Sequence, residues 1–185
     1  MHKKNKKKIQ NKKIDYFKWT LILFVLSFLL SATLNYISSY VSDRLPVIIS
    51  FILLFCIILL GIVFDIIGIA TTAADEVPFH SMAAKKVKGA KVSVWLIKNA
   101  SKVSSVCNDV IGDICGILSG ALSANIVFYI SKNSEANPIL LSILLTAMVA
   151  AITISGKSIG KYFAIKKSNE IVKISGKILG IFLKI

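Results

Sequence analysis

The chain has 185 residues, 55% of them apolar, a mean hydropathy of +0.74 and a formal net charge of +14. A soluble domain of this length is rarely so apolar, so the composition favours an integral membrane protein. The basic residues lie in three blocks at the ends of apolar runs, a pattern typical of membrane-flanking loops and unlike a nucleic-acid-binding surface. Three cysteines inside apolar runs argue against a disulfide framework or a zinc site.

The chain begins with a basic tail, residues 1–16, followed by an apolar run. We expect the tail to be disordered and attracted to anionic lipid headgroups, because lysines near a membrane surface bind them. The run from Phe17 to about Ile37 is long enough for a first transmembrane helix, within the range 17–40. A signal peptide is the alternative, but no small-residue cleavage site follows, so a retained helix is favoured.

A second span is predicted at 46–70, and Asp65 interrupts it about one turn from its end. Asp65 fits a functional residue or a boundary acid near headgroups equally well. The polar stretch that follows predicts a juxtamembrane helical hairpin at 79–101, with helices at about 79–88 and 90–101 divided by Gly89. Pro78 suits the first turn of such a helix, and Trp95 suits an interfacial anchor.

The third predicted span, 102–130, is apolar yet carries Asp109 and Asp113. Helical spacing places small residues on the same stripe as these acids, and it places an apolar face on the opposite side. The small residues are Gly112, Gly116, Gly120 and Ala124; the apolar face holds Ile114, Leu118 and Leu122. Acids inside a membrane usually face a cavity, an ion or a counter-charge, so we expect the acidic stripe to face the bundle interior. For the acids, an ordinary helix start near the interface is the alternative. The glycine stripe fits plain helix packing.

A fourth span is predicted at 139–156, and residues 161–185 form an amphipathic interfacial helix with isoleucines on one face. These are Ile171, Ile174, Ile178, Ile181 and Ile185.

With four spans, the basic blocks at 1–18, 85–102 and 157–185 all lie on one side, the cytoplasm. The expected fold is an all-α integral membrane protein with four transmembrane helices. We expect it in the plasma membrane as a multi-pass protein, both termini cytoplasmic.

Several short motifs occur in a recurring order from Pro46 onward. Ala73-Ala74-Asp75-Glu76 is followed by Ser81 five residues after the Glu, and Lys88-Gly89-Ala90 comes next. Asp109 and Asp113 stand four apart, and the last span ends with Gly156-Lys157-Ser158-Ile159-Gly160-Lys161. In this order the chain resembles the transmembrane domain of the CorB/CorC/CNNM magnesium and cobalt exporters over about three-quarters of its length. The matching domain would be 46–160, with 17–40 an additional helix and no counterpart of the family's CBS-pair module.

The resemblance implies a homodimer and an ion site, and the sequence departs from the family at that site. Matching positions make the ion-site candidates Asp75, Glu76, Asp109, Asp113, Gly156 and Lys157, with Asp109 and Asp113 the possible ligands of Mg²⁺. The family's two Asn are these two Asp here, and its Glu is Lys157. We therefore expect Lys157 to pair with Asp109 and Asp113 where relatives hold a cation. Snorkelling of Lys157 to the headgroups is the alternative.

Two functions follow from the resemblance. The first is divalent-cation transport, of Mg²⁺ or Co²⁺, or a divergent form of it. The alternative is a non-transporting membrane scaffold or regulatory relative whose ion site is filled by Lys157. Size and basic tails alone suggest a holin-like pore, against which the acids in the spans argue. An enzyme is not expected, because His2 lies in the tail and His80 has no nucleophile beside it in sequence.

Overall fold

The computed structural model describes residues 17–36, 46–134 and 137–183, and these residues form helices without any strand. Four helices are long and apolar enough to cross a membrane: Phe17–Tyr36, Val47–Ala73, Ala100–Asn133 and Pro138–Lys166. The sequence prediction of an all-α multi-pass membrane protein is confirmed. The basic tail 1–16 and most of the turn between the first two spans lie outside the described residues.

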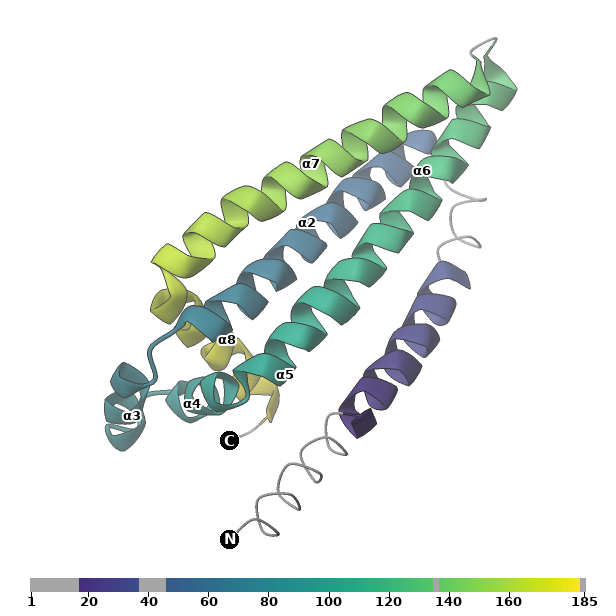
Figure 1. The fold of residues 1–185 in the computed structure, drawn as a ribbon. Helices are drawn as coiled ribbons and strands as arrows, with labels where there is room; N and C mark the ends of the chain where they lie inside the picture. The colour runs from purple at the N-terminus through teal and green to yellow at the C-terminus, as the bar shows by residue number, and fades with distance from the viewer. Residues whose placement is uncertain (1–16, 37–45, 135–136, 184–185) are drawn as a thin grey trace, which may run out of the picture.

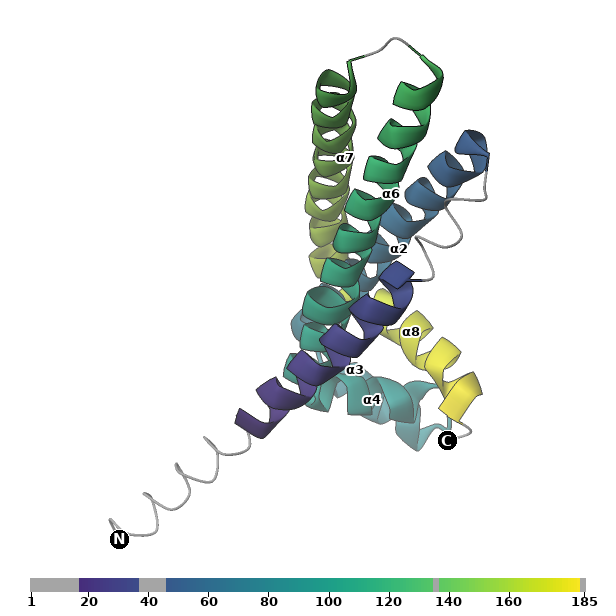
Figure 2. The ribbon, with the colours of Figure 1, turned by 90° about the vertical axis from the view of Figure 1, so that its right-hand side faces the viewer.

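Three of the spans form a bundle in which α2 (Val47–Ala73), α6 (Asp113–Asn133) and α7 (Pro138–Lys166) all pack against one another (Figures 1 and 2). One hydrophobic core of the bundle joins Leu54 and Ile58 of α2 to Leu122 and Ile126 of α6. The helix Phe17–Tyr36 lies outside this bundle, and none of its residues is buried (Figure 2). It touches the core through Leu23, which packs against the cluster of Val110, Ile114 and Leu118.

The third span is not a uniform α-helix. It begins as α5 (Ala100–Ser104), passes through the π-helix η1 (Ser105–Gly112) and continues as α6. The predicted span at 102–130 was correct in extent, but the π-helix was not predicted. The fourth span also runs ten residues beyond its predicted end, to Lys166, where α8 (Ser168–Leu183) begins after a one-residue break.

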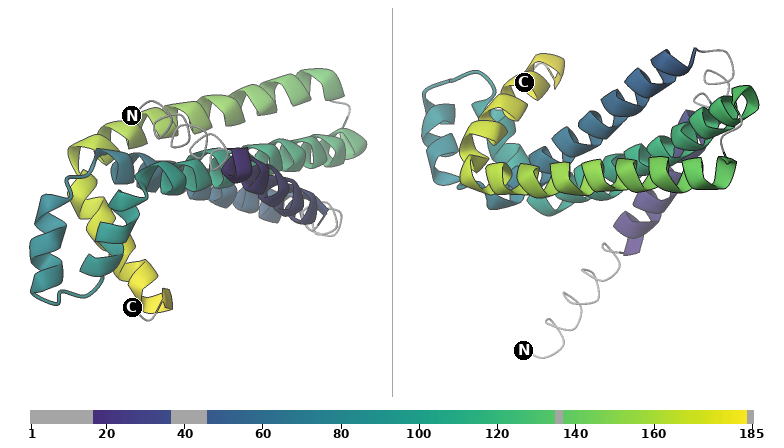
Figure 3. Two further views of the ribbon diagram at one scale, coloured as in Figure 1. Left: turned by 60° about the horizontal axis from the view of Figure 1, so that its bottom comes forward. Right: turned by 90° about the horizontal axis from the view of Figure 1, so that it is seen from above.

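Short helices form a layer across one end of the bundle, and this end is called the hairpin end below (Figure 3). The layer contains α3 (Val77–Ala84), α4 (Ala90–Lys98) and α8. Pro78 lies in the first turn of α3, as predicted. The α3 helix ends earlier than predicted, because Lys86 adopts a left-handed conformation with φ 55°. Phe79 and Val172, both fully buried, join this layer to Ala70 and Ala164 of the bundle.

The amphipathic helix α8 buries a small-residue face and leaves its isoleucines open. Ser93 Oγ of α4 donates a hydrogen bond of 3.1 Å to the carbonyl of Val172, and Gly176 lies against Gly89 and Ser93. Ile174, Ile178 and Ile181 are 52–72% exposed. The predicted isoleucine stripe is therefore available to lipid along most of α8. Of the three free cysteines, Cys107 and Cys115 are buried and Cys56 is exposed.

Candidate functional site

The acidic stripe of the third span faces outward, contrary to the prediction. Asp109 and Asp113 are exposed, and a Cβ added to Gly116 or Gly120 would meet no atom within 4 Å. The opposite face is buried instead, with Ile114 5%, Leu118 7% and Leu122 0% exposed. Burial of this branched apolar face against α2 gains far more packing contact than glycines could supply.

A groove of about 260 Å³ runs between α6 and α7 beside the outward stripe. Its lining consists of Gly116, Ser119, Gly120, Ser123, Thr146, Val149, Ala150, Thr153 and Ile154. The hydroxyls of Ser119, Ser123 and Thr153 each donate to the carbonyl four residues earlier, at 2.7–2.8 Å. Because these donors are satisfied within their own helices, the groove presents a mostly apolar surface of small side chains.

Lys157 pairs with Asp65, and not with the acids of the third span. Its Nζ lies 4.0 Å from Asp65 Oδ1, with side chains 30% and 14% exposed. The same Nζ lies 3.5 Å from the position that a Cβ of Gly112 would take. Within the described residues, no ion pair joins Lys157 to Asp109 or Asp113, so the predicted triad is wrong. The absence of a side chain at Gly112 leaves room for the ammonium between α2, η1 and α7.

Gly156 positions Lys157 by allowing α7 to approach α2 closely. A Cβ at Gly156 would lie 2.4 Å from Ile62 Cδ1, and one at Gly160 would lie 2.8 Å from Ile66 Cγ1. Glycines four residues apart on one helix face let a neighbouring helix pack tightly, as in other membrane proteins. Gly156, predicted as part of an ion site, therefore contributes through packing beside the charged residue.

Asn108, on the π-helix one turn before Gly112, places a second polar group against Gly68 of α2. Its Nδ2 donates to Ser104 Oγ at 3.3 Å, while its buried Oδ1 has no hydrogen-bond partner among the described residues. A Cβ added to Gly68 of α2 would lie 2.0 Å from this oxygen. A π-turn inside an α-helix often marks a functional site. We call Asp65, Asn108, Gly112 and Lys157 the interhelical polar site.

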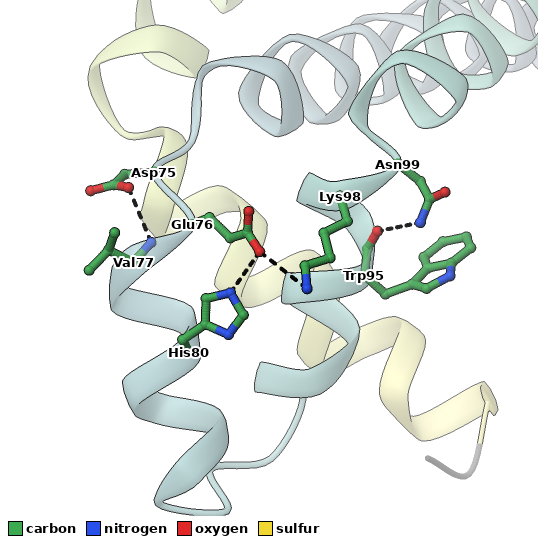
Figure 4. Close-up of polar contacts among 7 residues, drawn as sticks. All are labelled: Asp75, Glu76, Val77, His80, Trp95, Lys98 and Asn99. Carbon is green, nitrogen blue, oxygen red and sulfur yellow. Dashed lines mark hydrogen bonds and ion pairs between the residues drawn. The ribbon is translucent and has the colours of Figure 1, made fainter. Parts of the chain in front are cut away.

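Asp75 and Glu76 belong to a separate polar cluster at the hairpin end (Figure 4). Glu76 Oε1 lies 2.6 Å from His80 Nε2 and 3.6 Å from Lys98 Nζ. Asp75 Oδ1 accepts a hydrogen bond of 3.1 Å from the N–H of Val77, which starts α3. The N–H of Asp75 donates to Asn169 Oδ1 at 3.0 Å and links the turn before α3 to α8. These contacts hold the hairpin end together, and within the described residues no hydrogen bond or ion pair links them to the interhelical polar site.

The interhelical polar site supplies few ligands for a divalent cation. In the part of the chain that the structure describes, no three His, Cys, Asp or Glu residues lie close enough to hold a metal ion. Asp65 is the one carboxylate at the site with a paired cation, and sequence reasoning left its role open. The signal that could have identified it is its position along the helix. Asp65 and Lys157 both lie about 27–29 Å, at 1.5 Å per residue, from the N-terminal ends of α2 and α7.

No family model matches this chain, and searches of curated proteins and of solved structures found no significant match. The CorB/CorC/CNNM resemblance therefore rests on the motifs in the sequence, and family membership is not shown.

Proposed function

We propose that this chain is a divergent membrane protein with a CorC/CNNM-like transmembrane domain, in which Lys157 occupies the ion site and transport of Mg²⁺ or Co²⁺ has been lost. Its role would then be that of a membrane scaffold or regulatory subunit. The observation that supports this proposal is the position of the Lys157 ammonium, 4.0 Å from Asp65 Oδ1 and against Gly112.

The chemistry of Mg²⁺ supports the same proposal. Mg²⁺ requires oxygen ligands in near-octahedral array, and a lysine supplies none. Two unit charges 4 Å apart interact by about 4 kcal/mol at an effective dielectric constant near 20, and a divalent ion beside the ammonium would feel about twice that repulsion. The tethered ammonium already balances Asp65, so a free cation gains little by entering.

Transport in a divergent form is the second candidate, and Asn108 is the observation in its favour. Its buried Oδ1 lacks a hydrogen-bond partner, and a cation is one group that would satisfy such an oxygen. Asp109 follows Asn108 directly and Asp113 lies about one helical turn further along, both on the open face, where they could attract cations. In this mechanism, Lys157 would have to leave Asp65 before a cation could bind there.

The proposal includes a homodimer in the plasma membrane with its hairpin end and both termini in the cytoplasm. The α6–α7 groove and the open acids support the dimer, because a carboxylate facing lipid is unfavourable and glycines allow a second helix to approach. Cross-linking through Gly120→Cys, with the three native cysteines replaced, tests this arrangement. The Ile139→Cys variant, at the far end of α7, is the matched control.

A flux assay in proteoliposomes tests the functional proposal. Wild-type protein is expected to carry neither Mg²⁺ nor Co²⁺, and Lys157→Glu is expected to gain Mg²⁺ binding by calorimetry because it restores an oxygen ligand. Lys161→Glu, an exposed position one turn further along α7, is the matched control and should gain nothing. Wild-type flux that disappears in Asp65→Asn would contradict the scaffold proposal and support transport.

A further inference from the structure

The turn between α3 and α4 contains a cavity of about 420 Å³ that is lined by three lysines and no acid. Its lining residues are Ala83, Ala84, Lys86, Val87, Lys88, Gly89, Lys91 and Val92. Ion pairs in the described residues engage Lys98, Lys157 and Lys167, whereas the side chains of Lys86, Lys88 and Lys91 make no ion pair or hydrogen bond within this part of the chain. The cavity is therefore strongly positive and has no internal counter-ion.

The backbone of the turn fixes these lysines around the cavity. The N–H of Lys86 donates to the carbonyl of Ala83 and that of Val87 to Met82, at 3.0 Å each, which is the closing pattern of a helix that ends in a left-handed residue. Glycine usually occupies that position, but here it is Lys86, with φ 55°. No side chain caps the start of α4, and its first turn contains no acid.

One wall of this cavity packs against α8. Gly89, in that wall, lies so close to α8 that an added Cβ would be 2.6 Å from the backbone of Lys177, and Gly176 lies against it as well. At about 100° per residue, Ile174 and Ile178 lie on the opposite face of α8, where they are exposed. The cavity is therefore held against the small-residue face of α8, and the exposed isoleucines do not line it.

We propose that this cavity binds the phosphate headgroup of an anionic phospholipid. The position of the layer supports a lipid in particular. The layer crosses the ends of helices long enough to span a bilayer, which places the cavity at the headgroup level, where phospholipid is the most abundant phosphate (Figure 3). Clustered lysines beside a span bind anionic headgroups, each contributing about 1 kcal/mol.

Native mass spectrometry of the detergent-solubilised full chain, titrated with phosphatidylglycerol or phosphatidylcholine, tests this site. The Lys86→Gln/Lys88→Gln/Lys91→Gln variant should bind phosphatidylglycerol at least about tenfold more weakly, because three lysine contacts are lost. The matched control is Lys85→Gln/Lys161→Gln/Lys173→Gln, three exposed lysines outside the cavity with equal charge removed. It should stay within about threefold of wild type.

Two further arms separate the cavity from diffuse attraction and from free phosphate. Equal weakening in both triple variants, or equal binding of both lipids by wild type, would overturn the site. Displacement of the lipid by millimolar inorganic phosphate would show that the ligand is the free ion and overturn the lipid assignment.

Discussion

Two ion pairs in this protein join similar groups in different surroundings. The Lys157–Asp65 pair lies between three helices of the bundle, with side chains 30% and 14% exposed. The Lys98–Glu76 pair lies at the hairpin end, with side chains 57% and 36% exposed, and Glu76 also contacts His80. Exposed pairs contribute little to stability, whereas loss of one partner from a desolvated pair leaves an uncompensated charge. The first pair should therefore control stability, and the second should matter little.

The largest effect is expected when Lys157 is removed and Asp65 remains. Lys157→Leu should destabilise the fold by about 3–5 kcal/mol, because the carboxylate keeps its desolvated position without its cation. Thermal unfolding in detergent micelles measures the loss. The Asp65→Leu/Lys157→Leu double variant is the control, and it should recover most of the stability, since an apolar pair can replace an ion pair of similar volume. A double variant as unstable as the single one would contradict this reading of the pair.

A smaller loss of stability is expected when a methyl group is added at Gly68, beside the interhelical polar site. Gly68→Ala should destabilise the fold by about 1–3 kcal/mol, because the new Cβ would lie 2.0 Å from Asn108 Oδ1. Gly116→Ala is the matched control, since its Cβ would meet no atom within 4 Å. Comparison of the two unfolding temperatures checks the prediction. Equal losses in the two variants would mean that the contact between Gly68 and Asn108 does not limit the packing of α2.

At the hairpin end, a stabilising substitution is expected to weaken binding. Lys86→Gly should raise the stability of the turn by about 1 kcal/mol, because glycine adopts the left-handed conformation without a Cβ clash. The same change removes one of the three lysines of the cavity and should reduce its affinity for phosphatidylglycerol. Unfolding and lipid titration on one sample measure both quantities. Lys85→Gly, at the preceding residue with φ −79°, is the control and should be less stable than wild type.

The smallest effect is expected at the exposed pair. Lys98→Gln should change stability by about 0–1 kcal/mol, and less as salt is raised, because water screens both charges and Glu76 keeps its contact with His80. Unfolding at low and at high ionic strength measures the difference. A loss comparable with that of Lys157→Leu would remove the contrast between the two regions.

The sequence predicted the spans and the hairpin, because these depend on local signals. Apolar length defines a span, Pro78 starts α3, and Gly89 with φ 83° permits the turn before α4. The inward face of the third span could not be predicted in the same way. Lipid is as apolar as a bundle core, so an apolar stripe in a membrane helix does not by itself show which side is buried. Here the branched residues face inward, and the stripe faces outward at its acids, Gly116 and Gly120, while Gly112 is buried beside Lys157.

The partner of Lys157 could not be predicted from spacing either. Asp65 and Lys157 lie on different helices, and their contact depends on how closely α7 approaches α2 through Gly156 and Gly160. Spacing within one helix relates Asp109 to Asp113, but it does not relate either acid to α7. Asn108 was missed for a similar reason, since the π-helix that turns it toward Gly68 has no signature in residue type.

That π-helix has a consequence for how the third span tolerates change in length. A π-turn accommodates one residue more than the α-helix it replaces. Deletion of a single residue between Ser105 and Gly112 would let a regular α-helix replace the π-turn, so the flanking helices would keep their faces while the side chains inside the turn would shift. Asn108 would then leave Gly68, while the membrane-crossing length would barely alter. An indel that is harmless to topology would thus dismantle the polar interior of the bundle.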